Sequence, residues 1–274
     1  MQLPNIMEIV EKKFENLSYK YLRTGRNNHT LLFLHGFTGT SSVWDNYVEL
    51  LKNKFDILLV DLAGHGESES PKTIEEFYFQ NQAETIIRTL HNLEIGSVSV
   101  ISYSFSCYIA LLIKTGLKGK VKNMVFVSPF FKEKFGFSDR LIFGFIKLIW
   151  RYLIPNKKFK LDYSKLKNYE NPSFRDTEYT LKCINTKDVL GSIYSLANCE
   201  EVPELASLKI PLLIIYGEND KMLSDKTKSL LQKLEMAEIK MIKNKKHLFL
   251  RTEVPKIAER MESFLIRHSP VFPR

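Results

Sequence analysis

The chain has 274 residues, 44% of them hydrophobic, including 19 Phe and 12 Tyr, which supplies one large core and excludes a disordered chain. Its net charge of +9 comes from 40 basic and 31 acidic residues. The short lysine runs that start at Lys132, Asn156 and Lys243 lie far apart, which argues against a nucleic-acid-binding stripe and for a solvated basic surface.

The first part of the chain is expected to contribute an antiparallel pair at the edge of a sheet, over residues Ile9–Leu17 and Ser18–Thr24. Five later runs of apolar residues, flanked by Gly and Pro, are predicted to be buried strands. These runs begin at Leu31, Phe55, Ser97, Val121 and Pro211. Strands that are apolar almost throughout are typical of a parallel sheet covered on both faces.

Amphipathic or apolar helices are expected between these strands. Ser42 is predicted to cap a first helix, and Thr73 with Glu76 forms a capping-box pattern before a second. An almost wholly apolar helix is expected over Phe105–Leu117, and Pro255 suits the first turn of a last one. This alternation of strands and helices predicts an α/β fold, with a mostly parallel sheet flanked by helices.

The alternation stops between Phe130 and about Ala206. This stretch is rich in aromatic residues and lysine, and Pro155 and Pro172 interrupt it. The simplest interpretation is a segment that leaves the sheet and returns to it. We therefore divide the chain into a core of residues 1–129 and 206–274 and an inserted segment of residues 130–205.

Several features predict a cytoplasmic protein without a metal site. The three cysteines, Cys107, Cys183 and Cys199, have no spacing typical of a metal site or a disulfide framework. The N-terminal residues lack the pattern of a signal peptide. The most apolar stretch, Leu141–Ile154, contains Lys147 and Arg151 and is too short to span a bilayer, so no stable membrane insertion is expected.

Ser104 is the first candidate for chemistry. It lies between an apolar strand and the expected helix, where a sharp turn would expose its hydroxyl beside a helix N-terminus that favours an oxyanion. The pattern G-x-S-x-G describes such a nucleophile turn. This chain has Ser102 and Ser106 in place of the two glycines. Small residues are needed there, and serine is the next smallest polar choice.

Asp220 and His247 are the second and third candidates. Asp220 ends the strand that starts at Pro211, and His247 follows a short segment, Glu238–Ile242, that is expected to be the last strand. A carboxylate can fix the tautomer of an imidazole, which in turn can take the proton of a serine. Because these residues follow strands of a parallel sheet, they are expected at the same rim of the sheet.

A glycine-rich loop is the fourth candidate element. His35–Gly39 directly follows a predicted strand, and its two glycines would let the backbone fold over the nucleophile. The backbone N–H groups of Phe37 and Phe105 would then stabilise a developing negative charge.

Together these motifs resemble the α/β-hydrolase superfamily over nearly the whole chain. The segments LLFLHGFTG, VDLAGHGES, the turn at Ser104, IIYGEND and KKHLFLRTEVPKIAERMESFL occur in the family's order. The resemblance implies a triad of Ser104, Asp220 and His247, an oxyanion hole from Phe37 and Phe105, and no cofactor or metal. It also implies that residues 130–205 are a helical cap. A further match, at Asp61, Gly64, His65 and Gly66, is interpreted as a structural loop motif without a direct role in catalysis.

The resemblance predicts a carboxylesterase that acts on small-molecule esters with short to medium acyl chains. Superfamily members with an aspartate nucleophile, the haloalkane dehalogenases and epoxide hydrolases, do not fit Ser104. One alternative is the menaquinone-pathway synthase that eliminates pyruvate, although that family usually has Gly-Gly-Arg where this chain has Ser106-Cys107-Tyr108. Another is a catalytically degenerate binding protein, which the two missing glycines would suit.

A helix expected near Leu141–Leu153 supplies the last candidates. Its apolar residues, among them Leu141 and Phe145, are expected to form one face that packs on the core. Because ligand sites are mostly apolar, part of this helix could line an acyl pocket. Phe145 and Trp150 are the substrate-binding candidates on it.

Overall fold

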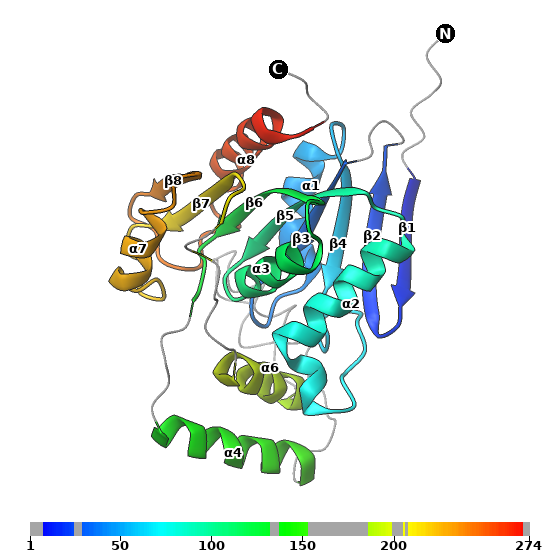
Figure 1. The fold of residues 1–274 in the computed structure, drawn as a ribbon, viewed down its shortest axis with the longest axis vertical. Helices are drawn as coiled ribbons and strands as arrows, with labels where there is room; N and C mark the ends of the chain where they lie inside the picture. Colours follow the sequence, from blue (N-terminus) through cyan, green and yellow to red (C-terminus); the bar gives the residue numbers. More distant parts are fainter. Residues whose placement is uncertain are drawn as a thin grey trace, which may run out of the picture.

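The computed structural model describes residues 8–24, 29–131, 137–152, 186–198, 205 and 208–270. Its centre is an 8-stranded sheet with the order β1-β2-β4-β3-β5-β6-β7-β8 (Figure 1). The strands are β1 (Glu8–Phe14), β2 (Leu17–Arg23), β3 (His29–Leu34), β4 (Asp56–Asp61), β5 (Ser97–Tyr103), β6 (Val121–Val127), β7 (Leu212–Gly217) and β8 (Ala237–Ile242). The predicted mostly parallel sheet and α/β fold are confirmed.

The two ends of the sheet differ in direction. β1 and β2 pair antiparallel at one edge, as the sequence predicted, and β2 continues antiparallel onto β4. From β4 to β8 every pairing is parallel. The carboxyl ends of β3 to β8 therefore lie at one rim, which is where the predicted site residues follow their strands.

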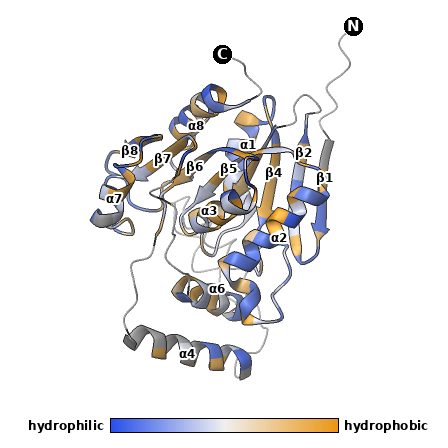
Figure 2. Ribbon diagram, viewed as in Figure 1, coloured by the Kyte–Doolittle hydropathy of each residue, from blue (hydrophilic) through white to orange (hydrophobic). Residues whose placement is uncertain are grey.

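Helices cover both faces of the sheet (Figure 1). They are α1 (Asp45–Leu51), α2 (Phe79–Asn92), α3 (Ser106–Gly116), α7 (Asp225–Leu231) and α8 (Val254–His268). Alternate residues of β3 point to opposite faces: Leu32 packs with α2 and α3, whereas Leu31 packs with α1 and α8. The central strand β4 is mostly hydrophobic, whereas α2 and α8 each combine hydrophobic and hydrophilic residues (Figure 2).

Three local predictions can be compared with the structure. The capping box of Thr73 and Glu76 is present, although it opens the short 3-10 helix η2 (Ile74–Phe77) that precedes α2. Pro255 lies in the first turn of α8, as predicted. The prediction for Ser42 is wrong, because a 3-10 helix, η1 (Ser41–Trp44), starts after Thr40, and Ser42 Oγ instead lies 2.7 Å from Thr40 Oγ1.

The loop after β4 has the structural role that the sequence suggested. The carboxylate of Asp61 accepts the backbone N–H of Ser41 at 2.7 Å and that of Glu67 at 2.9 Å. Gly66 has a φ of +53°, and a Cβ at this position would lie 2.2 Å from Asp61 Oδ2. Only glycine fits this turn without displacing the carboxylate that holds the loop together.

Two helices of the segment 130–205 lie apart from the layers of the sheet (Figure 1). They are α4 (Phe137–Tyr152) and α6 (Thr186–Asn198), and residues 153–185 lie outside the described residues. The hydroxyl of Ser70, in the loop after β4, donates to Asp188 of α6 at 2.8 Å. Because that loop follows the carboxyl end of β4, α6 contacts the side of the sheet where the candidate residues lie.

Candidate active site

Ser104 occupies the sharp turn between β5 and α3. Its φ of +59° lies in the left-handed region, where an L-residue persists only if its surroundings hold it. The backbone N–H of Ser104 donates to the carbonyl of Val127 at 3.0 Å, and the carbonyl of Ser104 accepts the N–H of Phe130 at 3.2 Å. These bonds fasten the turn to the end of β6 and hold Ser104 at the rim of the sheet.

The two serines in place of the turn glycines are both fully buried. The backbone N–H of Tyr103 donates to Ser106 Oγ at 3.1 Å, and this hydroxyl lies 3.2 Å from the carbonyl of Leu34 at the end of β3. Ser102 Oγ donates to Cys107 Sγ at 3.3 Å. A buried hydroxyl costs free energy unless it is hydrogen-bonded, so these partners explain how the turn accommodates serine.

Asp220 and His247 come from two loops that are fastened to each other. The backbone N–H of Asn219 donates to the carbonyl of Lys245 at 2.8 Å. A Cβ on Gly217 would lie only 2.4 Å from the same carbonyl, so a larger residue would separate the loops. The close packing of the loops after β7 and β8 therefore brings the carboxylate of Asp220 beside the imidazole of His247.

The three candidate side chains form one hydrogen-bonded row. His247 Nε2 lies 2.8 Å from Ser104 Oγ, and His247 Nδ1 lies 2.9 Å from Asp220 Oδ2. Burial favours the neutral form of Asp220, but hydrogen bonds from His247 and from the N–H of Met222 outweigh it and lower the pKa of Asp220. An ionised Asp220 accepts the Nδ1–H of His247, which leaves Nε2 free to accept the hydroxyl proton of Ser104.

The predicted oxyanion donors flank the turn at Ser104. Phe105 directly follows Ser104 at the N-cap of α3, and its ring meets that of Phe37 edge to face, with the centroids 6.1 Å apart. A Cβ on Gly36 would lie 3.5 Å from the Cβ of Ser104, so the loop with Phe37 passes directly beside the serine. Across the described ranges, neither the Phe37 nor the Phe105 N–H donates to a backbone carbonyl.

His35 orients the peptide group of Phe37, a role that the sequence did not predict. The N–H of Leu62 donates to His35 Nε2 at 2.9 Å, so the ring proton is on Nδ1, which donates to the carbonyl of Gly36 at 2.8 Å. Gly39 N–H donates to the same carbonyl. Because a trans peptide is planar, a carbonyl held on one side leaves the Phe37 N–H pointing to the other. Burial lowers the pKa of His35 and so favours the neutral ring, whose tautomer these hydrogen bonds select.

Two further residues without a predicted role contact His247. Tyr103 Oη and Ser128 Oγ donate to the backbone carbonyl of His247 at 3.2 Å and 3.1 Å. The ring of Tyr103 also stacks on the imidazole, with the centroids 5.9 Å apart. Only their positions at the ends of strands could have indicated these residues from the sequence. Tyr103 ends β5, and Ser128 directly follows β6 at the rim where Ser104 lies.

The two substrate-binding candidates on α4 occupy different sides of this helix. Trp150 is buried, packs edge to face on Phe77 and donates its Nε1–H to the carbonyl of Lys187 at 2.8 Å. Phe145 is 61% exposed, and Leu141 is 63% exposed. The expectation that Leu141 and Phe145 share a core-facing side is therefore wrong. The buried indole fixes the rotation of the helix, and Phe145, five residues earlier, lies about 140° around the axis.

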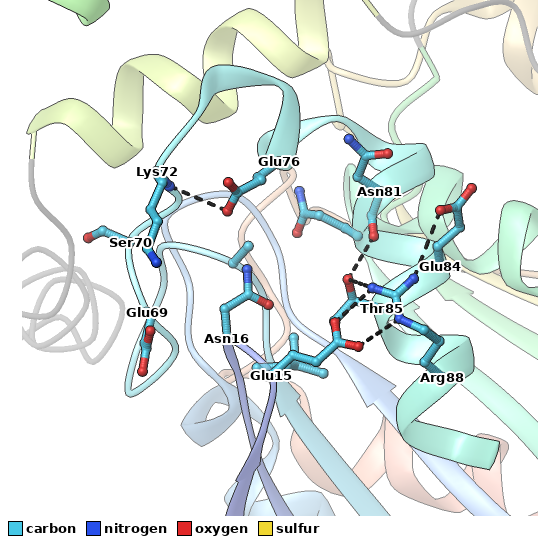
Figure 3. Close-up of a pocket in the computed structure, with 13 residues that line it drawn as sticks. Glu15, Asn16, Glu69, Ser70, Lys72, Glu76, Asn81, Glu84, Thr85 and Arg88 are labelled. Carbon is cyan, nitrogen blue, oxygen red and sulfur yellow. Dashed lines mark hydrogen bonds and ion pairs between the residues drawn. The ribbon is translucent and has the colours of Figure 1, made fainter. Parts of the chain in front are cut away.

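A cavity of about 550 Å³ lies elsewhere, between the β1–β2 turn, the loop after β4 and α2 (Figure 3). Its lining includes four glutamates, and the guanidinium of Arg88 pairs there with the carboxylate of Glu15. None of the residues of the Ser104 row lines this cavity. It is a polar hollow rather than an apolar acyl site.

The described residues contain neither a candidate membrane span nor a candidate metal site. No helix in these ranges is both long enough and apolar enough to cross a membrane. In the same ranges, no three His, Cys, Asp or Glu side chains are grouped as a metal site requires.

Sequence comparisons give relatives along most of the chain. A sequence model of the alpha/beta hydrolase fold matches residues 29–252. The chain is 28% identical over 227 residues to the pimeloyl-[acyl-carrier protein] methyl ester esterase of Wigglesworthia glossinidia brevipalpis, a match that covers 77% of this chain and 82% of the relative. It is 26% identical over 226 residues to the uncharacterized hydrolase YugF of Bacillus subtilis (strain 168), covering 75% and 78% of the two chains.

Solved structures share the fold. A thermophilic esterase from Thermogutta terrifontis matches with a TM-score of 0.75 at 15% identity, covering 96% of this chain and 100% of that one. MenH from S. aureus matches with a TM-score of 0.73 at 20% identity, covering 91% and 98%. Such identities show the fold alone, whereas the sequence model spans more than half of the chain. The chain therefore belongs to the alpha/beta hydrolase fold family.

Proposed function

We propose that this protein is a serine hydrolase that cleaves small-molecule carboxylic esters with short to medium acyl chains, without a cofactor. The observation that carries the proposal is the row of three side chains, with Ser104 Oγ 2.8 Å from His247 Nε2 and His247 Nδ1 2.9 Å from Asp220. A serine hydroxyl is a weak nucleophile, and an adjacent imidazole oriented by a carboxylate is the standard means of activating it. The 28% identical esterase relative supports the same reaction class.

In the first half of the proposed reaction, Ser104 Oγ attacks the acyl carbon of the ester while His247 Nε2 takes the hydroxyl proton. The negative charge that develops on the carbonyl oxygen faces the N–H groups of Phe37 and Phe105. Collapse of the tetrahedral intermediate breaks the bond to the alcohol oxygen, and His247 returns the proton to this leaving group. An acyl group then remains on Ser104.

In the second half, a water molecule gives a proton to His247 Nε2 and attacks the same acyl carbon. The second tetrahedral intermediate collapses with release of the acid, and His247 returns the proton to Ser104 Oγ. Asp220 stays ionised throughout and stabilises the imidazolium. The low pKa of Asp220 suits this role, because a neutral carboxyl group would not favour the protonated ring.

The proposal includes a helical cap formed by residues 130–205. Its described helices support this, because α6 contacts the loop after β4 through Asp188, and α4 contacts α6 through Trp150. A cap at this rim would exclude water and limit the size of the acyl group. Trp150 remains a candidate for shaping that space indirectly, whereas the exposure of Phe145 gives no support to a contact with the acyl group.

The pyruvate-eliminating alternative has weaker support. It requires groups that bind a dianionic substrate, and that family usually provides an arginine at the position of Tyr108. In this chain Tyr108 is 5% exposed and packs against the rings of Phe79 and Phe131. An aromatic cluster of this kind suits an apolar acyl group better than a carboxylate.

The decisive experiment is a panel of p-nitrophenyl esters of increasing acyl length, assayed with the wild-type protein and Ser104→Ala. We expect turnover that peaks at a short or medium chain length and is lost in the variant. Turnover of the succinyl-cyclohexadiene substrate with negligible ester hydrolysis would instead favour the eliminating enzyme. Absence of both activities, together with absence of fluorophosphonate labelling at Ser104, would favour the binding protein.

A further inference from the structure

Helix α4 presents large apolar side chains to solvent. Leu141, Phe145 and Leu148 are 63%, 61% and 53% exposed. They follow one another at intervals of four and three residues, so they form a stripe along one side of the helix. In the part of the chain that the structure describes, none of the three belongs to a hydrophobic cluster. An exposed stripe of this kind typically marks a contact with a partner.

The opposite side of α4 holds the helix against the rest of the protein. Trp150 is buried there, and Lys147 Nζ pairs with the carboxylate of Glu75 in η2 at 2.7 Å. Helical geometry places the three exposed residues about 140° to 180° around the axis from Trp150. In Figure 1, α4 lies beyond α6 at the end of the molecule farthest from the sheet. The apolar stripe therefore faces away from the core at one end of the molecule, where a flat surface can reach it.

The positive charge of the chain is concentrated in the segment that contains α4. Residues 132–187 include 13 Lys and Arg against 6 Asp and Glu, a net charge of +7 out of +9 for the whole chain. On α4 itself, Arg151 is exposed and follows Leu148 by three residues, so it lies beside the stripe. An arginine can lay its stem along an apolar surface while its guanidinium binds a phosphate. Apolar and basic side chains in this arrangement are complementary to an anionic bilayer surface.

We propose that α4 is an interfacial helix, whose stripe of Leu141, Phe145 and Leu148 docks the protein on the surface of an anionic phospholipid bilayer. The helix lies in the plane of the surface and does not span the bilayer. The three apolar side chains enter the boundary between headgroups and acyl chains, while Arg151 stays at the level of the phosphates. Docking of this kind is independent of the proposed ester hydrolysis, because it uses no residue of the Ser104 row.

Two attractions act together in such a contact. The buried apolar area supplies one, and the attraction between basic residues and anionic lipid supplies the other. Salt screens the second attraction but not the first. Binding should therefore require both the stripe and anionic lipid, and it should weaken as the salt concentration rises. A second copy of this chain on the same stripe would require no lipid.

The test is sedimentation of the full chain with vesicles of phosphatidylcholine alone or mixed equally with phosphatidylglycerol. We expect the wild-type protein to bind the mixed vesicles and to bind the neutral ones about tenfold more weakly or less. Leu141→Gln, Phe145→Gln and Leu148→Gln should each lower the partition coefficient roughly tenfold, and their combination should abolish binding. Leu50→Gln is the matched control and should bind like the wild type, because Leu50 is 51% exposed on α1.

A fluorescence measurement identifies the residues that enter the lipid. Phe145→Trp places an indole on the stripe, and Leu50→Trp places one on α1. Brominated phosphatidylcholine in the mixed vesicles should quench the added fluorescence of Phe145→Trp and leave that of Leu50→Trp unchanged. Both variants retain the two native tryptophans, Trp44 and Trp150, so a difference between them comes from the added ring. This measurement does not require the combined glutamine variant to fold.

Three results would each overturn the docking. The first is absence of wild-type binding to the mixed vesicles, whether or not ultracentrifugation shows a dimer that the combined variant dissociates. The second is equal binding of the wild type and the folded combined variant, since charge alone would then explain the attraction. The third is equal quenching of Phe145→Trp and Leu50→Trp. Ser104→Ala should bind vesicles like the wild type, so a failure to hydrolyse esters would contradict only the proposed function.

Discussion

Gly36 lies against the ring of Tyr103, so closely that a Cβ on Gly36 would be 2.7 Å from Tyr103 Cδ1. Gly36 supplies the carbonyl of the peptide whose N–H belongs to Phe37, whereas Tyr103 precedes Ser104, the proposed nucleophile, and stacks on His247. The contact therefore joins the loop of one predicted oxyanion donor to His247, the proposed base. Glycine is required because any side chain would push the loop away from Ser104.

Gly36→Ala should reduce kcat by about 10²-fold, the effect expected when one oxyanion donor is displaced. The variant should remain folded, because the loop can move outward without opening the sheet. Gly96→Ala is the control, since a Cβ at Gly96 meets nothing within 4 Å. Steady-state kinetics with circular dichroism would check this, and normal kcat for Gly36→Ala would exclude Phe37 as a donor.

Ser104→Ala should lower ester turnover by about 10³-fold or more, since the nucleophile is removed. A fluorophosphonate should label Ser104 in the wild-type protein. It should not label Ser102 or Ser106, because both are fully buried and their hydroxyls are hydrogen-bonded. Mass spectrometry of the labelled peptide would decide, and stoichiometric labelling of the Ser104→Ala protein would contradict the assignment.

Activity should rise with pH as the imidazole of His247 loses its proton, because a protonated ring cannot accept the proton of Ser104. Asp220 has a lowered pKa and stays ionised over this range, so its own titration should appear only at more acidic pH. The stability of the fold should also decrease at acidic pH. The contribution of Asp220 to the free energy of unfolding is fully present above the pKa of this carboxyl group in the unfolded chain. It is lost as the pH falls through the lower pKa of the folded state.

Asp220→Asn should lower kcat by about 10⁴-fold, because an amide no longer favours the Nδ1–H tautomer of His247. The nearby acidic residues are poorly placed to substitute. The carboxylate of Glu218 accepts the N–H of Asn244, and that of Asp225 pairs with Lys228. Near-normal rates for Asp220→Asn would require a different carboxylate in the mechanism.

Ser106→Gly would place glycine where the G-x-S-x-G pattern has it, yet it should destabilise this protein. The Ser106 hydroxyl accepts the buried N–H of Tyr103 and contacts the carbonyl of Leu34. Loss of these bonds should lower the free energy of unfolding by about 1–3 kcal/mol. Ser106→Ala separates the hydroxyl from backbone flexibility, since glycine in a helix costs about 1 kcal/mol more than alanine. Urea unfolding of both variants would measure this.

On α4, Trp150→Ala and Phe145→Ala should differ strongly. Trp150 is buried against Phe77, and truncating such a side chain typically costs about 3–5 kcal/mol. Phe145 is 61% exposed, so its removal should change neither stability nor the preferred acyl length. Thermal unfolding and the ester panel would test both statements. A changed acyl-length preference for Phe145→Ala would indicate that Phe145 does contact the acyl group.

The sequence predicted the sheet and the order of the candidate site residues along the chain, because both depend on local patterns. Apolar runs, the turn at Ser104, and the positions of Asp220 and His247 after strands can all be read along the chain. The roles of His35 and Ser128 could not, because each acts through contacts with residues distant in sequence. The prediction of which side of α4 faces the core was also wrong. Periodicity can define an apolar side of a helix, but here the burial of Trp150 determines which side turns inward.

The pairing of β6 with β7 has a consequence for how such a protein can change. These strands are hydrogen-bonded neighbours through Met124–Val127 and Leu212–Ile215, yet the chain between them leaves the sheet. The entropy of closing a loop grows only slowly with its length, by about 0.6 kcal/mol for each doubling. Segments of very different length and sequence could therefore connect the same two strands at little cost. Substrate choice could diverge by replacement of this connection while Ser104, Asp220 and His247 stay where the sheet holds them.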